Sequence, residues 1–330
     1  MKVFLTGGTG FLGKNVARHL REAGHELRVL ARTGSQLAGL PEDAEKVAGD
    51  VTDLDSLRRG ASGCDAVVHM AALVKMWVPD RARFDAVNVG GLRHALAAAK
   101  EAGARLLYTS SFIAIGPAGP TPAGESQVHP RDRYRNDYER TKAMADAVAS
   151  EAVEAGQDVV RLYPGVVYGP GDMTDGNLVV KMVADHLAGR FPGIVGPGDR
   201  LWSYAYVEDV ARGHVLALER GKAGERYFLA GDNVSMNDFF AILREVAGTP
   251  PPRRHIPYWL AWLLGYGMYS WAELTGLPPQ LTHEVVGVFR EHWAYSSEKA
   301  ARELGYGPRG LADGLKATLA WLRETGAVAV

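Results

Sequence analysis

Three side chains of this 330-residue sequence have the types and the spacing for proton transfer: Ser111, Tyr138 and Lys142. Tyr138 and Lys142 stand one helical turn apart, so a helix would present both on the same side. A lysine ammonium near a phenol favours the phenolate and lowers its pKa, which makes a tyrosine a usable general acid or base near neutral pH. The hydroxyl of Ser111 could hydrogen-bond a substrate oxygen as charge develops there.

A glycine turn in the run TGGTGFLG, residues 6–13, predicts where a nucleotide would bind. It follows an apolar strand and opens a helical pattern, which is the context of a dinucleotide site. Gly7 would allow the sharp turn, Gly10 the approach of backbone amides to a pyrophosphate, and Gly13 close packing of the helix on the sheet. The helix N-terminus would add N–H donors and partial positive charge. We expect the cofactor to contact Gly7, Thr9, Gly10, Phe11, Leu12 and Gly13.

The end of the second predicted strand favours NADP(H) over NAD(H). An acidic residue at this place would bind the ribose 2′-hydroxyl, whereas an arginine suits a 2′-phosphate. The sequence reads Ala31-Arg32-Thr33, so Arg32 offers a guanidinium fork and no carboxylate is present. NAD(H) stays possible if Arg32 is simply a solvated residue. Asp50 and Val51, after the third strand, are expected at the adenine edge.

Apolar runs alternate with helical patterns over the first two thirds of the chain, which predicts an α/β fold: a Rossmann-type doubly wound parallel sheet. The predicted strands are 2–6, 26–31, 45–48, 66–69, 105–110, 158–163 and a later one at 225–229, and the predicted helices are 10–23, 56–60, 84–102 and 138–155. Beyond residue 170, clear alternation is expected to stop. We therefore expect a dinucleotide-binding domain over 1–170, rejoined by part of 203–230, and a smaller substrate-capping lobe over 171–330.

Composition excludes several other classes of protein. A net charge of −1 argues against a nucleic-acid partner, which would require a concentrated basic surface. The single Cys64 excludes an intramolecular disulfide, and the histidines lack metal-ligand spacing, so we expect no metal. The glycine turn begins so early that no room is left for a signal peptide, which predicts a cytoplasmic protein.

The segment 256–274 is almost uncharged and nearly long enough to cross a bilayer. A proline and two glycines interrupt it, so a spanning helix is not expected. The favoured interpretation is a helix that caps an apolar pocket or forms a dimer face. Reversible contact with a membrane surface is the less favoured alternative.

The chain resembles the extended short-chain dehydrogenase/reductase family along nearly its whole length, in the motifs TGGTGFLG, GDVTD, VVHMAA, VNVGG, LLYTSSFIAIG, YERTK, RLYPGVVYGPGD and YVEDVARGH. The resemblance implies that Ser111, Tyr138 and Lys142 are the catalytic triad, with Ser110 or Thr109 as alternatives for the hydroxyl. It further implies cofactor contacts from Ala71, Ala72, Asn88 and Pro164, with Asn88 supporting the lysine and Pro164 packing near the nicotinamide. A homodimer through the helices 88–102 and 138–155 is also implied.

Within that family, the sequence is most similar to dihydroflavonol-reductase-like and 3β-hydroxysteroid-dehydrogenase-like members. Sugar-nucleotide members usually carry an arginine where this chain has Trp202, and a second where it has Val285. Losing two bidentate phosphate donors disfavours a nucleotide-sugar ligand. We therefore expect reduction of an apolar, ring-bearing carbonyl substrate, with an NAD-dependent sugar-nucleotide epimerase or dehydratase as the alternative and a non-catalytic NADP sensor as a minor one. Substrate contacts are expected from Trp77, Phe112, Asn177 and Trp202.

Overall fold

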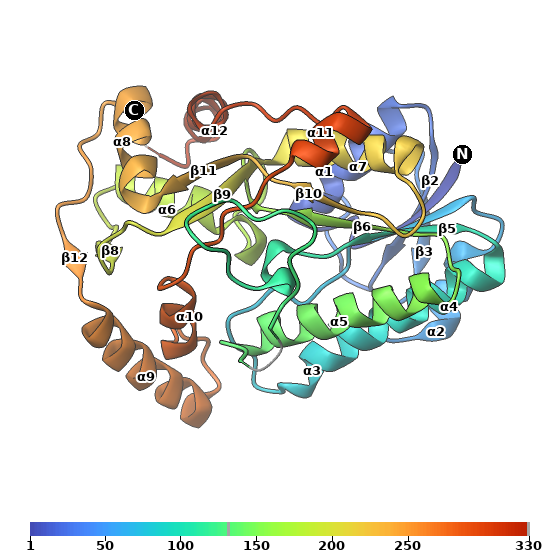
Figure 1. Cartoon of the computed structure of the whole chain (residues 1–330), viewed down its shortest axis with the longest axis horizontal. Helices are drawn as coiled ribbons and strands as arrows, with labels where there is room; N and C mark the ends of the chain where they lie inside the picture. Colours follow the sequence, from blue (N-terminus) through green and yellow to red (C-terminus); the bar gives the residue numbers. More distant parts are fainter. Residues whose placement is uncertain (131–132, 329–330) are drawn as a thin grey trace.

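A parallel seven-stranded sheet forms the centre of the computed structural model, which describes residues 1–130 and 133–328. Its strand order is β10-β6-β5-β4-β1-β2-β3, and every pairing is parallel. Figure 1 shows the sheet with helices on both sides. The strands are β1 (Lys2–Thr6), β2 (Glu26–Ala31), β3 (Glu45–Ala48), β4 (Ala66–His69), β5 (Arg105–Thr109), β6 (Val159–Pro164) and β10 (Arg226–Leu229). The order reverses between β1 and β4, and a crevice at the carboxyl ends of such neighbouring strands is where open α/β sheets bind ligands.

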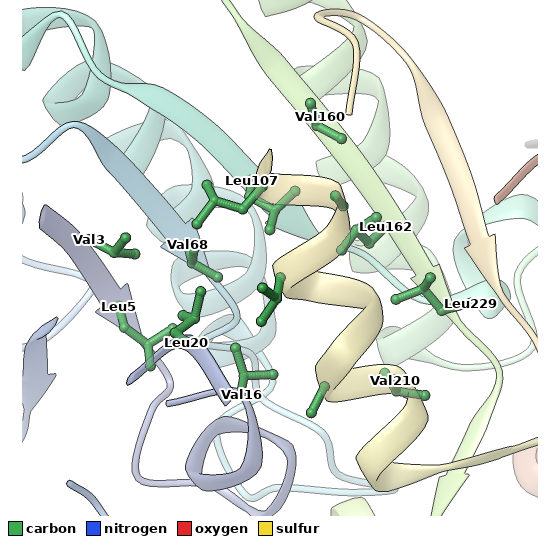
Figure 2. Packing of buried hydrophobic residues seen from close by; sticks show 14 of the residues in the cluster. Val3, Leu5, Val16, Leu20, Val68, Leu107, Val160, Leu162, Val210 and Leu229 are labelled. Atoms are coloured by element: carbon green, nitrogen blue, oxygen red, sulfur yellow. The ribbon is translucent and has the colours of Figure 1, made fainter. Parts of the chain in front are cut away.

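Helices cover both faces of this sheet. One face is covered by α1 (Phe11–Glu22), α7 (Val207–Arg220) and α11 (Glu298–Leu304), and the other by α2 (Leu54–Ala61), α4 (Gly91–Ala102) and α5 (Asp137–Glu154). Figure 2 shows Val16 and Leu20 of α1 packed among strand side chains that include Leu5. Val3 and Leu5 of β1 point to this face, whereas Phe4 between them belongs to the opposite core. Burial on both faces explains the almost continuous apolar runs of the strands.

The expected doubly wound sheet is therefore confirmed, and each predicted strand agrees with an observed one to within a residue at either end. The predicted helix 84–102 is more complex, because it consists of α3 (Ala82–Phe84), a π-helical stretch η1 (Asp85–Gly90) and α4. Alternation of strand and helix resumes over residues 201–229, the stretch of which part was expected to rejoin the sheet. Strand β9 (Leu201–Tyr206) leads into α7, which leads into β10 of the central sheet.

The remaining segments build a second layer beside the carboxyl edge of the sheet. It contains a three-stranded sheet of β7 (Val166–Tyr168), β9 and β11 (Asp232–Ser235), and a two-stranded pairing of β8 (Ile194–Val195) with β12 (His255–Ile256). Its helices are α6 (Leu178–Leu187), α8 (Met236–Ala247), α9 (Tyr258–Thr275), α10 (His283–Val288) and α12 (Leu311–Glu324), with short turns η2 (Phe112–Ile115) and η3 (Asp175–Asn177). Its apolar core packs α6, α8 and α12 around β9.

Two glycines of the turn after β1 are required by close backbone approach. Gly7 has a φ of 75°, and a Cβ there would lie 2.6 Å from the backbone nitrogen of Ala71. A Cβ on Gly13 would overlap the carbonyl oxygen of Gly7. Gly10 is different, because its φ is −83° and a Cβ would meet that oxygen at 3.4 Å. At Gly7 and Gly13 the turn therefore packs without room for side chains.

Replacing Gly13 with alanine should destabilise the fold by about 2 kcal/mol or more, since backbone must move to admit the methyl group. Gly10→Ala is the matched control in the same turn, and it should cost no more than about 1 kcal/mol, because only N-cap preference is lost. Urea unfolding of the two variants measures the difference. Equal losses would contradict the packing described for Gly13.

Candidate active site

The carboxyl edge of the sheet brings the glycine turn to the end of β1. Helix α1 begins there with Gly10 as its N-cap, and no side chain caps it. Its first-turn amides are therefore available to a phosphate, which a helix N-terminus binds well. Thr9 is half-buried, and the ring of Phe11 is buried against Gly171, so Phe11 can offer its backbone rather than its side chain.

The residues that follow β2 and β3 lie at the same sheet edge, where the adenosine half of a dinucleotide would bind. Ala31 pairs with Ala48, which places Arg32 and the loop after β3 next to each other at the same edge. Arg32 is exposed. Asp50 accepts hydrogen bonds from the backbone and hydroxyl of Thr52, at 2.9 and 2.8 Å, while Val51 is buried. The uncapped helix, the crowded glycine turn and an exposed guanidinium fit a nicotinamide dinucleotide.

Asn88 connects the loop after β4 to α5. Its Oδ1 accepts a hydrogen bond from the backbone of Leu73 at 2.7 Å, and its Nδ2 donates to Thr141 Oγ1 at 3.0 Å. The loop that contains Ala71 and Ala72 is thereby fixed beside the glycine turn. The resemblance implied that Asn88 supports the lysine, and the structure places its contact on Thr141, the neighbour of Lys142 in the chain.

Lys142 is almost completely buried, with 2% of its surface exposed. Its Nζ donates to the hydroxyl of Tyr108 at 3.2 Å and to the carbonyl oxygen of Thr109 at 3.1 Å. Burial lowers the pKa of Lys142 from 10.5 to about 7, and the charge of Asp146 acts in the opposite direction. The amine therefore lies at the end of β5 and can change its charge near neutral pH.

Tyr138 and Ser111 meet at the start of α5. A hydrogen bond with Ser111 lowers the pKa of the Tyr138 phenol, but burial raises it more, so the pKa lies above its usual value. The sequence-based expectation that Lys142 lowers this pKa was wrong, because burial dominates and the ammonium is directed to Tyr108 instead. A phenol with a raised pKa is protonated at neutral pH and is a proton donor.

The three hydroxyls of Thr109-Ser110-Ser111 have different surroundings. Thr109 Oγ1 hydrogen-bonds His214 Nε2 at 2.9 Å, deep in the fold. The hydroxyl of Ser110 is also buried. Ser111 is the N-cap of η2, where its Oγ accepts from the backbone of Ile113 at 3.4 Å, and it is the one that hydrogen-bonds Tyr138. Pro164 ends β6 beside Leu229 and is buried at the same sheet edge.

Aromatic rings form a cluster directly after Ser111. Phe112 lies 5.5 Å from Trp293, 5.8 Å from Tyr295 and 6.4 Å from Trp202, measured between ring centroids. Trp202 continues the cluster to Phe289 at 5.5 Å. Two of the four predicted substrate residues, Phe112 and Trp202, are thus brought together next to the candidate catalytic hydroxyl.

The other two predicted substrate residues are used inside the fold. Trp77 is buried, and its indole Nε1 donates to Glu273 Oε1 of α9 at 2.6 Å. Asn177 is fully buried, and its Nδ2 donates to the carbonyl oxygen of Gly169 at 3.0 Å. Neither residue is part of the aromatic cluster. Their hydrogen bonds show that both have structural roles.

Sequence reasoning missed Tyr108 and Asp146. Asp146 is buried, accepts a hydrogen bond from Tyr163 Oη at 2.5 Å, and stands one further helical turn beyond Lys142. The equal spacing of Tyr138, Lys142 and Asp146 was the available signal for a third polar group on this face of α5. Tyr108 precedes the hydroxyl run at the end of β5, and only the fold brings it to the ammonium.

Known proteins resemble this chain along most of its length. Residues 3–230 match the model of the NAD-dependent epimerase/dehydratase family. A putative dihydroflavonol 4-reductase of Synechocystis is 34% identical, covering 98% of this chain and 95% of the relative, and the sterol demethylase protein B of Methylococcus capsulatus is 32% identical, covering 99% and 100%. The UDP-glucose 4-epimerase of Thermus thermophilus, solved with NAD, is 25% identical with a TM-score of 0.75, covering 98% and 99%.

The buried ammonium predicts a pH-dependent stability. As pH falls from about 10.5 to about 7, Lys142 gains its proton in the unfolded chain but not in the folded one, so its cost to stability grows. Lys142→Met should therefore raise the free energy of unfolding at pH 7 by at least about 1 kcal/mol, and the gain should fade towards pH 10. Exposed Lys181→Met is the control. A gain that does not shrink with rising pH, in urea titrations, would contradict this description.

Proposed function

The chain belongs to the NAD-dependent epimerase/dehydratase family of NAD(P)-dependent enzymes, and we propose that it reduces the ketone or aldehyde of a largely apolar, ring-bearing substrate with NADPH, or oxidises the corresponding alcohol. The observation that carries this proposal is the pair of partly buried rings of Phe112 and Trp202, which follow Ser111 and cover the fully buried Trp293. Apolar walls with a few polar groups at one end are typical of sites for uncharged organic ligands.

The glycine turn and the start of α1 would hold the pyrophosphate, and Arg32 would bind a 2′-phosphate through its guanidinium fork. Asp50 would accept from the adenine amine, and Lys142 would hydrogen-bond the ribose next to the nicotinamide. When bound, this cofactor supplies or accepts the hydride. The end of β2 carries no carboxylate that would favour an unphosphorylated ribose.

Tyr138 is the proton donor of the proposed reduction. Its raised pKa keeps the phenol protonated, and the proton passes to the carbonyl oxygen as negative charge develops there. Ser111, hydrogen-bonded to Tyr138, orients the same oxygen. In the oxidation direction, the same groups remove the proton from the alcohol.

The similarity to a UDP-glucose 4-epimerase supports a second candidate, a sugar-nucleotide epimerase or dehydratase that retains NAD. Against it stands Trp202, whose ring packs in the aromatic cluster at a position where an arginine would bind a diphosphate. The two candidates differ in whether the oxidised and reduced cofactors leave the enzyme between turnovers.

Tyr138→Phe should lower turnover by roughly 10²- to 10⁴-fold, because it removes the donated proton and little volume. NADPH affinity, measured by calorimetry, should stay within about threefold of the wild type. Tyr134→Phe, four residues earlier, is a control that should retain activity. Full activity of the Tyr138 variant would overturn the proposed chemistry.

Arg32→Ala should weaken NADPH binding by about tenfold or more and leave NADH binding unchanged, since only NADPH carries the 2′-phosphate. Titration of both nucleotides against wild type and variant provides the test, with NADH as the internal control. Tighter binding of NADH than NADPH by the wild type would favour the epimerase alternative.

A further inference from the structure

Helix α9 exposes large apolar side chains and buries small ones, the reverse of an ordinary surface helix. Its buried residues are Ala261, Gly265 and Ala272. Its outer surface and the turn after it expose Trp259, Trp262, Leu263, Leu264, Tyr266, Met268, Trp271, Leu274 and Leu277. Trp259 is 69% exposed and Leu274 is 82% exposed. Figure 1 shows α9 at the lower left edge of the molecule, with α10 beside it.

The small residues of α9 fit α10 closely. A Cβ on Gly265 would lie 2.7 Å from the backbone nitrogen of His283, so glycine is required at this contact. Trp262 and Tyr266 stack at 5.4 Å between ring centroids, and both meet the His283 ring edge-on. The small residues of α9 are therefore in contact with α10, whereas most of its large apolar side chains remain exposed.

This concentration of exposed apolar residues is specific to α9 and its C-terminal turn. Nine of the sixteen large apolar residues that are exposed in the described chain lie between residues 259 and 277. The others are scattered over distant elements. Contiguous apolar surface of this kind marks a site of interaction with another protein or a membrane.

The charges around α9 are complementary to an anionic surface. Arg253 and Arg254, just before the helix, and Arg290, after α10, expose their side chains. The nearby carboxylates are already engaged: Glu273 accepts from the Trp77 indole, and Glu284 pairs with Arg81 at 3.1 Å. At the N-terminal end of α9, exposed Arg253 and Arg254 precede the helix and Arg290 lies over the Tyr258 ring at 5.3 Å, and we call this end the charged rim.

We propose that α9 docks on the surface of a bilayer containing anionic lipids, with its tryptophans and leucines at the boundary between headgroups and acyl chains. Tryptophan is enriched at that depth, leucine contributes buried apolar area, and arginines bind lipid phosphates. Among residues 1–130 and 133–328, none of the helices could span a bilayer. A second copy of this chain fits the surface less well, because a two-fold interface must be self-complementary and the rim is cationic.

The docking surface is connected to the candidate active site. Arg81 donates to Tyr269 of α9 at 2.9 Å and pairs with Asp137, the residue before Tyr138. A pocket of about 670 Å³ opens between α9 and α10, with Trp259, Trp262 and Val286 in its walls. Docking would thus place this pocket at the lipid surface, although the docking itself does not depend on the proposed reaction.

Flotation of the full-length protein with vesicles tests this proposal. We expect binding to vesicles of phosphatidylcholine with phosphatidylglycerol, and much weaker binding to phosphatidylcholine alone or in high salt. Replacing Leu263, Trp271 and Leu274 together with serine should reduce binding about tenfold or more. The matched control replaces Val128, Met144 and Leu178, exposed apolar residues on other elements, with serine and should bind as the wild type does.

The charged rim is tested separately by Arg253→Glu combined with Arg254→Glu, which removes no apolar surface. This variant should lose binding to the anionic vesicles, whereas Arg93→Glu with Arg244→Glu, the same charge change on α4 and α8, should keep most of it. NADPH affinity and thermal midpoint verify that each variant is folded. Absence of flotation with either vesicle, equal binding to neutral vesicles, or a wild-type dimer that the triple serine variant converts to monomer would overturn the proposal.

Discussion

The candidate site depends on one buried cationic group, the amine of Lys142 at the end of β5. Two oxygen atoms hold it, the hydroxyl of Tyr108 and the carbonyl of Thr109, and burial moves its pKa to about 7. Burying a charged amine there lowers the free energy of unfolding. The charge of Asp146, on the same helix, offsets only part of this loss. The hydrogen bonds of its amine to β5 and the link from Asn88 to Thr141 therefore hold in place a group that weakens the fold and that we propose for the reaction.

The central sheet could be predicted because its strands are short apolar runs separated by helical patterns and glycine stops, which are local features. The second layer could not be predicted in the same way. Strands β8 and β12 contain two residues each, and β9 pairs with β7 on one side and β11 on the other. Such pairings join distant segments, so neither length nor periodicity marks them, whereas β10 of the central sheet was predicted as the strand 225–229.

At the candidate site, spacing along the chain predicted which residues meet but not the direction in which their pKa values are shifted. Ser111 and Tyr138 do lie together, and Lys142 is on the same helix. The direction of the Tyr138 pKa depends on burial, which the helical spacing does not contain. Trp77 was chosen for its apolar ring, yet its partner Glu273 comes from α9, almost two hundred residues later. The unusual surface of α9 likewise needed the structure, because composition does not reveal which side of a helix is buried.

The proposed reaction transfers a hydride from NADPH to the product. The oxidised cofactor is then released and replaced in each turnover. The most direct measurement is mass spectrometry of the alcohol formed from apolar ring-bearing ketones with NADPH deuterated on the transferred position. We predict one deuterium per product molecule, continued turnover with free NADPH, and far less labelled alcohol per unit time from the Tyr138→Phe variant. An enzyme that purifies with tightly held NAD, takes no deuterium from NADPH and interconverts nucleotide sugars would contradict the account.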